Sequence, residues 1–249
     1  MNSFKARGIV LCEQEAGESD KRLVLLCKSA GKLLVYARGA RKAKSKMLAA
    51  SQLFTYGDFV INDGGNFLSV GQAEPIERFN GICADYDKTC AAHYAAEICD
   101  RTTLPATECD GTLRLLLKTL SVLAGHAPSA ADAPPRQTAS VFLLRFFLCY
   151  GIAPEIDRCC VCGAPVQKMT VIFFCDEGTL CGPCRAQKPF NSELPLPSHA
   201  ALKHVMESDL NGAFFFTLAP KYLDSLQQAA RLMWKSHFDI QLKSEPLLG

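Results

Sequence analysis

Long apolar runs are missing from this sequence. No window of about 18 consecutive apolar residues occurs, so the sequence predicts no membrane span. The first apolar segment, residues 8–12, is followed at once by Glu13 and is too short for the core of a signal peptide. We therefore expect a globular protein that works without a membrane.

Recognisable catalytic motifs are also missing. The sequence has no Gly-x-Ser-x-Gly, His-Glu-x-x-His or Gly-x-Gly-x-x-Gly pattern, and its five histidines lack the spacing of metal ligands. Residues 29–33 resemble the end of a phosphate-binding loop, but the first glycine and the final Ser or Thr are absent. We expect no enzyme. A nuclease built on four nearby acids is a further hypothesis, but a solvated turn is the simpler interpretation of Glu13, Glu15, Glu18 and Asp20.

Acidic residues are absent from residues 21–57, a segment that carries nine lysines and arginines. The whole chain has a net charge of +2, which leaves −7 for the rest and concentrates positive charge near the N-terminus. Five of these cations fall within residues 36–46, around Gly39, where a ligand could approach the backbone closely. The segment predicts a polyanionic partner, most commonly nucleic acid, and a solvated loop is the alternative.

Aromatic residues flank this basic segment. Small barrels bind single strands through a cationic groove combined with base stacking on aromatic rings. The sequence does not tell which rings face outwards, but Phe59 and Phe67 are expected in the core. The aromatic residues in question are Tyr36, Phe54, Tyr56, Phe59 and Phe67.

Cysteine, in contrast, is abundant. Thirteen cysteines, an odd number, argue against a disulfide-bonded secreted scaffold and for a reducing, cytoplasmic setting. Seven lie in apolar or helical contexts and are expected to be small buried hydrophobic residues: Cys12, Cys27, Cys83, Cys90, Cys99, Cys109 and Cys149.

The other six cysteines lie between residues 159 and 184. Cys159 with Cys162 and Cys181 with Cys184 form two Cys-x-x-Cys pairs separated by 18 residues. An apolar strand and turn at residues 170–178 would bring the second pair back to the first. Four thiolates with no open ligand position predict a structural site for one Zn²⁺ per chain. A unit this small should depend on the metal for folding. Two more cysteines leave the ligand choice open, although we take both as non-ligands: Cys160 and Cys175.

The sequence divides into a β-rich part and a helical part. Because no long helix interrupts the strands, residues 1–80 predict a small closed or partly closed barrel, and residues 81–249 predict a helical domain. Strands are expected at residues 7–12, 22–27, 33–37, 53–61 and 66–72, with a polar turn at 13–20 and a short helix or loop at 42–50. Helices are expected at residues 84–103, 110–123, 136–150, 198–211 and 220–238, with a loop at 125–135 and the metal unit at about 155–190.

Several motifs, in the same order, resemble the RecO family of DNA repair proteins, and the likeness covers nearly the whole chain. The N-terminal motifs are Gly8-Ile-Val-Leu11, Gly17-Glu-Ser-Asp20, Gly31-Lys-Leu33, Ala37-Arg-Gly-Ala-Arg41, Lys44-Ser-Lys46 and Gln52-Leu-Phe54. Further on, Pro154-Glu-Ile-Asp-Arg-Cys159, Gly178 and the paired cysteines resemble the family's zinc unit. The chain departs from the family at Thr179, where a second glycine is common, and in its two additional cysteines.

The resemblance implies an α+β fold, in which an N-terminal five-stranded OB-type β-barrel is followed by an α-helical domain carrying a four-cysteine zinc unit. It also implies a recombination mediator and not an enzyme. Such a protein binds single- and double-stranded DNA, anneals strands, and assists recombinase loading on DNA coated with single-strand-binding protein. The implied partners are RecR and the acidic tail of single-strand-binding protein, in the cytoplasm at the nucleoid.

The family's basic loop maps onto five residues of this chain, and two neighbouring cations complete the set. The candidate DNA-binding residues are Lys21, Arg22, Arg38, Arg41, Lys42, Lys44 and Lys46. The candidate metal ligands are Cys159, Cys162, Cys181 and Cys184. The alternative function is an interaction scaffold that does not bind DNA and whose basic loop binds an acidic peptide.

Overall fold

The computed structural model describes residues 2–127, 133–169 and 171–248. The chain forms two compact units, residues 1–126 and 127–249. No helix in the described ranges combines the length and the apolar character needed to cross a membrane. Residues 128–132 of the expected loop and Thr170 of the expected metal-unit hairpin lie outside the described residues.

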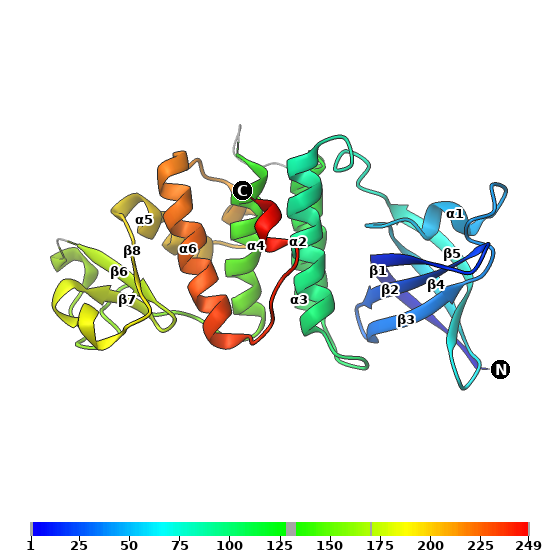
Figure 1. The fold of residues 1–249 in the computed structure, drawn as a ribbon, viewed down its shortest axis with the longest axis horizontal. Coiled ribbons are helices and arrows are strands. Elements are labelled where there is room, and N and C mark those ends of the chain that lie inside the picture. The colour runs from blue at the N-terminus through cyan, green and yellow to red at the C-terminus, as the bar shows by residue number, and fades with distance from the viewer. Residues whose placement is uncertain (1, 128–132, 170, 249) are drawn as a thin grey trace. The chain divides into compact units, whose positions relative to one another are not determined.

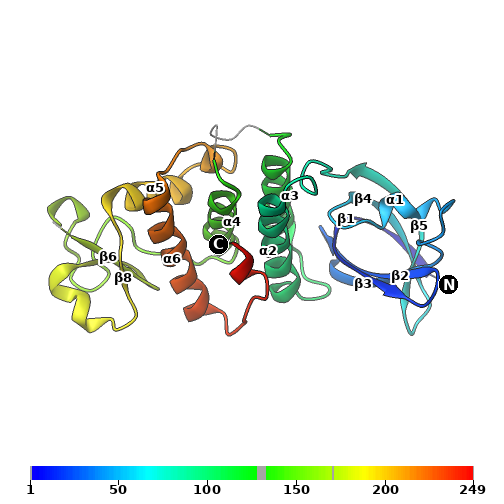
Figure 2. The same ribbon diagram turned by 45° about the horizontal axis from the view of Figure 1, so that its top comes forward.

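The first unit contains a closed five-stranded barrel. Its strands are β1 (Asn2–Ala16), β2 (Asp20–Cys27), β3 (Gly31–Ala37), β4 (Tyr56–Asp63) and β5 (Leu68–Glu77), drawn in blue to cyan in Figure 1. They follow one another around the ring in the order β1-β2-β3-β5-β4. Figure 2 shows this ring of strands in a second view. Neighbouring strands pair antiparallel except β3 and β5, which run parallel. The predicted fold class, a five-stranded OB-type barrel followed by helices, is confirmed.

Alternating side chains fill the barrel. On β3, Val35 and Ala37 belong to the barrel core, whereas Leu34 between Leu33 and Val35 is exposed, as the two-residue period of a strand requires. Ile9 and Leu11 of β1 are buried outside this core, where α2 packs against β1. The core contains Ala6, Val10, Leu23, Leu25, Cys27, Val35, Ala37, Ala40, Phe59, Ile61 and Val70.

Strand β1 is much longer than the predicted strand at residues 7–12. Its first half pairs with β4 and its second half pairs with β2, up to the pair Ala16–Asp20. The polar turn predicted at residues 13–20 therefore shrinks to residues 17–19. The sequence hid this extension because the end of the hairpin has no buried face, so it shows no apolar alternation.

Strand β4 starts later than predicted, at Tyr56 and not at residue 53. The backbone of Phe54 has a φ of 60°, which a strand does not allow, and its side chain is buried against His93 with ring centroids 5.4 Å apart. The apolar character of residues 53–55 therefore reflects burial in a turn.

The barrel is seated on two helices, α2 (Tyr86–Thr102) and α3 (Asp110–Leu123), through the turn between β2 and β3. The amide of Ala106 donates to the carbonyl of Ala30 at 3.1 Å. Gly31 has a φ of +63°, and a Cβ there would lie 2.5 Å from the carbonyl oxygen of Leu104. Only glycine fits this backbone conformation and this close approach.

The second unit is organised around α4 (Pro135–Cys149), with α5 (Leu196–Glu207) and α6 (Pro220–His237) packed on it. As its apolar sequence predicts, α4 is buried on nearly all sides. Phe146 of α4 meets Trp234 and Phe238 with ring centroids 6.2 and 5.9 Å apart.

A small sheet completes the second unit. Its strands are β6 (Ile172–Cys175), β7 (Gly178–Cys181) and β8 (Ser192–Glu193), in the order β7-β6-β8, and α6 packs against β6 and β8. The short 3-10 helices of this unit are η1 (Val166–Lys168), η2 (Gly182–Gln187), η3 (Gly212–Phe214) and η4 (Glu245–Leu248).

The two compact units divide after His126, so α2 and α3 group with the barrel. The division predicted at residue 80 marks the change from strands to helices. It stays a prediction about which part of the chain folds alone.

Gly31→Ala should lower the free energy of unfolding by about 2–4 kcal/mol, because the methyl group adds a backbone clash to the strain of a positive φ. The matched control is Gly125→Ala, which also has a positive φ but open space around the new methyl group. It should lower the free energy of unfolding by about 1–2 kcal/mol. Urea unfolding followed by circular dichroism measures both free energies. Equal losses in the two variants would show that the close approach of Gly31 to Leu104 does not constrain the barrel.

Candidate nucleic-acid interface and metal centre

The basic segment, residues 38–46, connects β3 to the one-turn helix α1 (Met47–Ala50). It is a series of turns closed by backbone hydrogen bonds, such as Lys42 N–H to Gly39 C=O at 3.1 Å and Ser45 N–H to Lys42 C=O at 2.9 Å. The helix or loop predicted for residues 42–50 is thus a turn segment followed by a short helix. All five of its cations are exposed: Arg38, Arg41, Lys42, Lys44 and Lys46.

Asp20, at the start of β2, anchors the beginning of this segment. Its carboxylate accepts hydrogen bonds from the Gly39 amide at 2.7 Å and from the Ser19 hydroxyl at 3.1 Å. The Gly39 hydrogen bond is the main reason that the pKa of Asp20 lies below its ordinary value, and the nearby charges of Arg38 and Lys42 lower it further.

Arg41 ties the basic segment to the turn between β1 and β2. Its guanidinium lies 2.9 Å from a Glu15 carboxylate oxygen and donates to the carbonyls of Gly17 and Glu18 at 3.1 and 3.2 Å. About a third of the side chain stays exposed, 32%. Arg41 therefore braces the turn as well as adding charge to the surface.

Lys21 is the least accessible of the seven candidates. Its ammonium group pairs with Glu13, and its side chain is 13% exposed. Together with Glu15 and Asp20, Glu13 brings negative charge back beside the basic segment. The charge separation seen along the sequence is therefore smaller in space.

The same pairings bear on the nuclease hypothesis. Glu13 and Glu15 are engaged by cations, and Asp20 by a backbone amide. Across the described ranges, the four acids at residues 13–20 do not form a cluster that could hold a metal ion.

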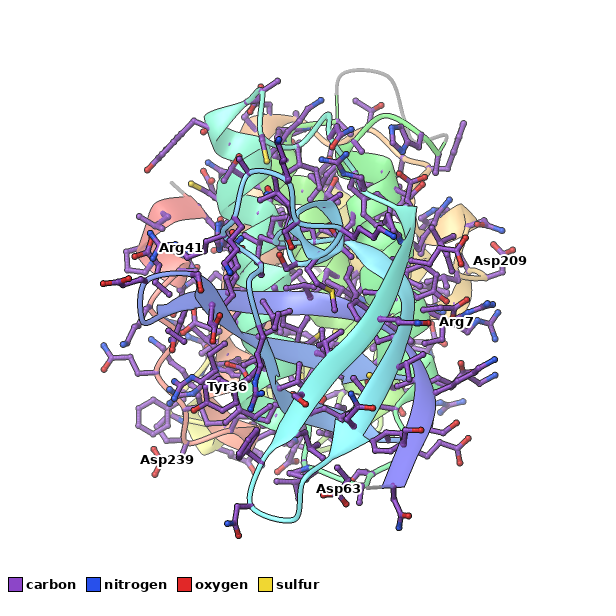
Figure 3. All side chains as sticks on the ribbon, turned by 90° about the vertical axis from the view of Figure 1, so that its right-hand side faces the viewer. Arg7, Tyr36, Arg41, Asp63, Asp209 and Asp239 are labelled. Atoms are coloured by element: carbon purple, nitrogen blue, oxygen red, sulfur yellow. The ribbon has the colours of Figure 1, made fainter. Side chains whose placement is uncertain are left out.

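Arg22 lies opposite Tyr36 in the register of β2 and β3, and its guanidinium donates to the Gln14 side chain at 2.6 Å. In Figure 3, Tyr36 and Arg41 lie on the same side of the view and Arg7 lies on the other. Arg22 thus lies near Tyr36 and the start of the basic segment, whereas Lys46, at the end of the segment, lines a pocket together with Arg7.

The flanking aromatic residues divide into a core set and a surface pair. Phe54 and Phe59 are buried, and Tyr56 is half-buried. The prediction that Phe67 lies in the core is wrong: 44% of it is exposed, in the loop between β4 and β5, where its ring meets that of Tyr36. Composition alone could not reveal this, because an apolar ring has the same sequence signature in a core and on a surface.

The sequence also gave no sign of a groove on the barrel wall. It has a volume of about 870 Å³ and is lined by residues of β1, β4, β5 and α1. Lys5 and Lys46 line it, and Arg7 forms a two-bond ion pair with Asp58 inside it, with both bonds 2.7 Å long.

Four cysteines in the second unit come together. The β6–β7 hairpin pairs Ile172 with Cys181, and the first cysteine pair is joined to β7 by the Cys160 amide, which donates to the Thr179 carbonyl at 2.9 Å. The sulfur atoms of the four all lie within 4.8 Å of one another: Cys159, Cys162, Cys181 and Cys184.

The donor set fits a tetrahedral metal ion. A metal–sulfur distance of about 2.3 Å requires sulfur atoms about 3.8 Å apart, and the Cys162 and Cys181 sulfurs are 3.7 Å apart. Burial alone would raise the pKa of Cys159, but backbone amides, including those of Cys162 and Cys181, lower it to about 6. These four residues could therefore hold a metal ion.

The two additional cysteines face each other beside this cluster. The sulfur atoms of Cys160 and Cys175 are 3.8 Å apart. Burial, followed by the neighbouring Cys175, raises the pKa of Cys160 to about 12. Among the described residues, the group of sulfur atoms close enough to share one ion contains neither Cys160 nor Cys175, which agrees with treating both as non-ligands.

The sequence predicted that the seven remaining cysteines are all buried, but only four of them are. Cys83 and Cys149 are exposed and Cys12 is half-buried, which corrects the prediction for these three. Burial does raise the pKa of Cys27 to about 12 and that of Cys109 to about 11. The buried ones are Cys27, Cys90, Cys99 and Cys109.

Fold and site together define a protein with an N-terminal barrel and a helical part that carries a four-thiol cluster. The family described as Recombination protein O N terminal matches residues 1–79, and Recombination protein O C terminal matches residues 83–246. The chain belongs to the RecO family.

Curated relatives match over most of their length. The chain is 30% identical over 250 residues to the DNA repair protein RecO of Bacillus pumilus, covering 99% of this chain and 93% of the relative. It is 28% identical over 239 residues to that of Acetivibrio thermocellus, covering 96% and 93%. It is 29% identical over 260 residues to that of Anaeromyxobacter dehalogenans, covering 100% of both. Membership of this family supports a role in recombinational DNA repair.

Replacing Asp20 should loosen the basic segment. In Asp20→Ala the Gly39 amide loses its acceptor and should exchange with solvent about tenfold faster at pH 7. Asp20→Asn keeps an acceptor without the charge, so its Gly39 amide should exchange at a rate between those of wild type and Asp20→Ala. Hydrogen exchange resolved over residues 38–46 measures the effect.

The same contact predicts a pH dependence. The pKa of Asp20 is lower in the folded protein than in the unfolded chain. The contribution of Asp20 to the stability of the basic segment is therefore complete above the unfolded pKa of about 3.9, and it is lost as the pH falls through the folded pKa. Wild-type exchange should therefore approach that of Asp20→Asn in acid. Equal exchange in wild type and Asp20→Ala at pH 7 would contradict the anchoring role.

Proposed function

We propose that this protein is a DNA-binding recombination mediator that binds single- and double-stranded DNA through the basic segment of its barrel. The observation that carries the proposal is the ordered basic segment, which presents several cations from one short stretch. Lys44 and Lys46 form no ion pair within the part of the chain that the structure describes, so they are available to phosphates.

The chemistry suits a sequence-independent task. Lysine and arginine contacts to phosphates position a strand without reading its bases. Annealing of complementary strands, and loading of a recombinase on DNA coated with single-strand-binding protein, both require such a grip. RecR and the acidic tail of single-strand-binding protein are the proposed protein partners, on the strength of the family. In this role the protein binds and hands on DNA and does not act as an enzyme.

The seven candidate cations contribute unequally in this proposal. Arg38, Lys42, Lys44 and Lys46 are the direct phosphate contacts, and Arg22 extends the same side along β2. Two others act mainly by holding the surrounding structure, because each already pairs with an acid: Lys21 and Arg41.

A second candidate function is a scaffold whose basic segment binds an acidic peptide. The contact between Arg41 and Glu15 favours it, because a carboxylate already occupies one cation of the segment. A titration with a labelled oligonucleotide across salt concentrations separates the two functions, because the scaffold would not bind the oligonucleotide. Cleavage of the oligonucleotide that depends on magnesium would instead reveal a nuclease.

We assign zinc to the four-cysteine cluster as part of the same proposal. Cys159, Cys162, Cys181 and Cys184 would hold one Zn²⁺ per chain. With four protein ligands and no open position, the ion supplies structural cross-linking and no catalysis. The core around it is small, so the second unit should depend on the metal to keep β6, β7 and η2 together.

Lys42→Ala with Lys44→Ala should weaken binding of a single strand about tenfold near 0.1 M salt. The slope of log affinity against log salt should flatten by about 1.4, because two phosphate contacts are lost. Fluorescence anisotropy with a labelled oligonucleotide measures both quantities. The charge-matched control is Lys221→Ala with Lys235→Ala, two exposed lysines of α6, and this variant should keep both the affinity and the slope. An unchanged slope in the first variant would count against the basic segment as the phosphate contact.

Metal analysis of the purified protein should find about one zinc per chain. Cys181→Ala should lose the metal and the solubility together, because the remaining thiols cannot complete the tetrahedron. Cys160→Ala, a matched change beside the cluster, should keep the metal. A purified wild-type protein that is fully folded without metal, or a Cys160→Ala variant that loses it, would show that the ligand set is different.

A further inference from the structure

We infer that Tyr36 and Phe67 form a stacking platform for unpaired bases, so that this side of the barrel distinguishes single strands from duplex. The inference rests on the proposed DNA-binding function and adds to it the part of the nucleic acid that is recognised. Phosphate contacts act on both forms of DNA, whereas a free aromatic face acts only on bases that have left a duplex.

The platform is made by two elements that the barrel brings together. The parallel pairing of β3 with β5 places Tyr36 opposite Ser69, two residues after Phe67. The rings of Tyr36 and Phe67 meet edge to face, with centroids 5.9 Å apart and planes at 80°. This contact orients the Phe67 ring while 44% of the residue stays exposed.

The platform continues along the outer face of β3. Leu34 lies beside Tyr36 on this face, because side chains two residues apart in a strand share a face. Leu34 is 49% exposed. A single exposed apolar residue needs no explanation, but Leu34, Tyr36 and Phe67 together form an apolar surface that a soluble protein usually covers or uses.

Cations border this apolar surface. The Arg38 guanidinium carbon lies 5.6 Å from the centroid of the Phe67 ring, and Arg22 lies opposite Tyr36 on β2. Both are among the candidate DNA-binding residues, so phosphates held there would place the attached bases next to the rings. This charge favours single-stranded nucleic acid over an apolar protein segment as the occupant.

The place of the platform in the barrel agrees with this occupant. Five-stranded barrels of the OB type bind oligonucleotides on the face of their second and third strands, between the loops that follow the first and fourth strands. Arg22 and Tyr36 belong to the second and third strands, and Phe67 belongs to the loop after the fourth. Arg41 braces the loop after the first.

The experiment compares full-length wild type with Phe67→Ala on two labelled probes, an oligo(dT) strand and a hairpin duplex, across several salt concentrations. Phe67→Ala should bind oligo(dT) about 5- to 100-fold more weakly, which corresponds to the loss of one base stack. Its salt slope should equal that of wild type, because no phosphate contact is removed. Its affinity for the duplex should change less than about twofold.

Matched variants separate stacking from apolar bulk. Phe67→Leu keeps an apolar side chain without a ring and should behave like Phe67→Ala, whereas Phe67→Trp should restore binding of oligo(dT). The new indole should also lose fluorescence on titration with oligo(dT), relative to the wild-type signal of Trp234. Phe4→Ala removes another exposed phenylalanine of the barrel, on β1, and should leave both affinities unchanged.

Each outcome of these titrations supports or overturns the stacking platform. Equal losses on strand and duplex, a changed salt slope, or wild-type binding by Phe67→Leu would overturn the platform while leaving the phosphate grip in place. If Phe67→Ala instead lost binding of an acidic peptide and kept that of oligo(dT), the surface would be a peptide dock. If wild type bound neither probe at any salt concentration, the proposed function itself would fail.

Discussion

The short parallel pairing of β3 with β5 is the constraint on which the candidate interface depends. Two register pairs, Val35 with Leu68 and Tyr36 with Ser69, join these strands and close the ring. Parallel pairs are slightly weaker per residue than antiparallel ones, so burial of Val35 in the barrel core contributes to holding them. The same pairing fixes the end of β3, where the basic segment begins, and brings the β4–β5 loop beside it.

The sequence carried enough information for the fold class because hydrophobic alternation is a signal wherever one face of an element is buried. It worked for β3, with Val35 and Ala37 inward, and for α4, which is buried on nearly all sides. It failed at the polar end of β1, where neither face is buried. It also failed at Phe67, since a ring in a surface loop and a ring in a core have the same composition, and only the strand register separates them.

The candidate sites differ in how far spacing along the chain could predict them. Two Cys-x-x-Cys pairs with a hairpin between them contain their own geometry, and the structure brings those four sulfur atoms together. The distribution of charge along the chain says less about geometry. Pairing of β1 with β2 brings Glu13 and Glu15 next to Lys21 and Arg41. Which cations contact DNA therefore stays a prediction that rests on exposure.

Glu15 makes Arg41 a contested position. In the proposed function, a phosphate at this guanidinium would compete with a carboxylate and with the carbonyl oxygens of Gly17 and Glu18. The net gain at that point is then the difference between two anionic partners, far smaller than a new ion pair would provide. Under that proposal the hairpin itself contains a competitor for the bound strand, and this competitor would favour release.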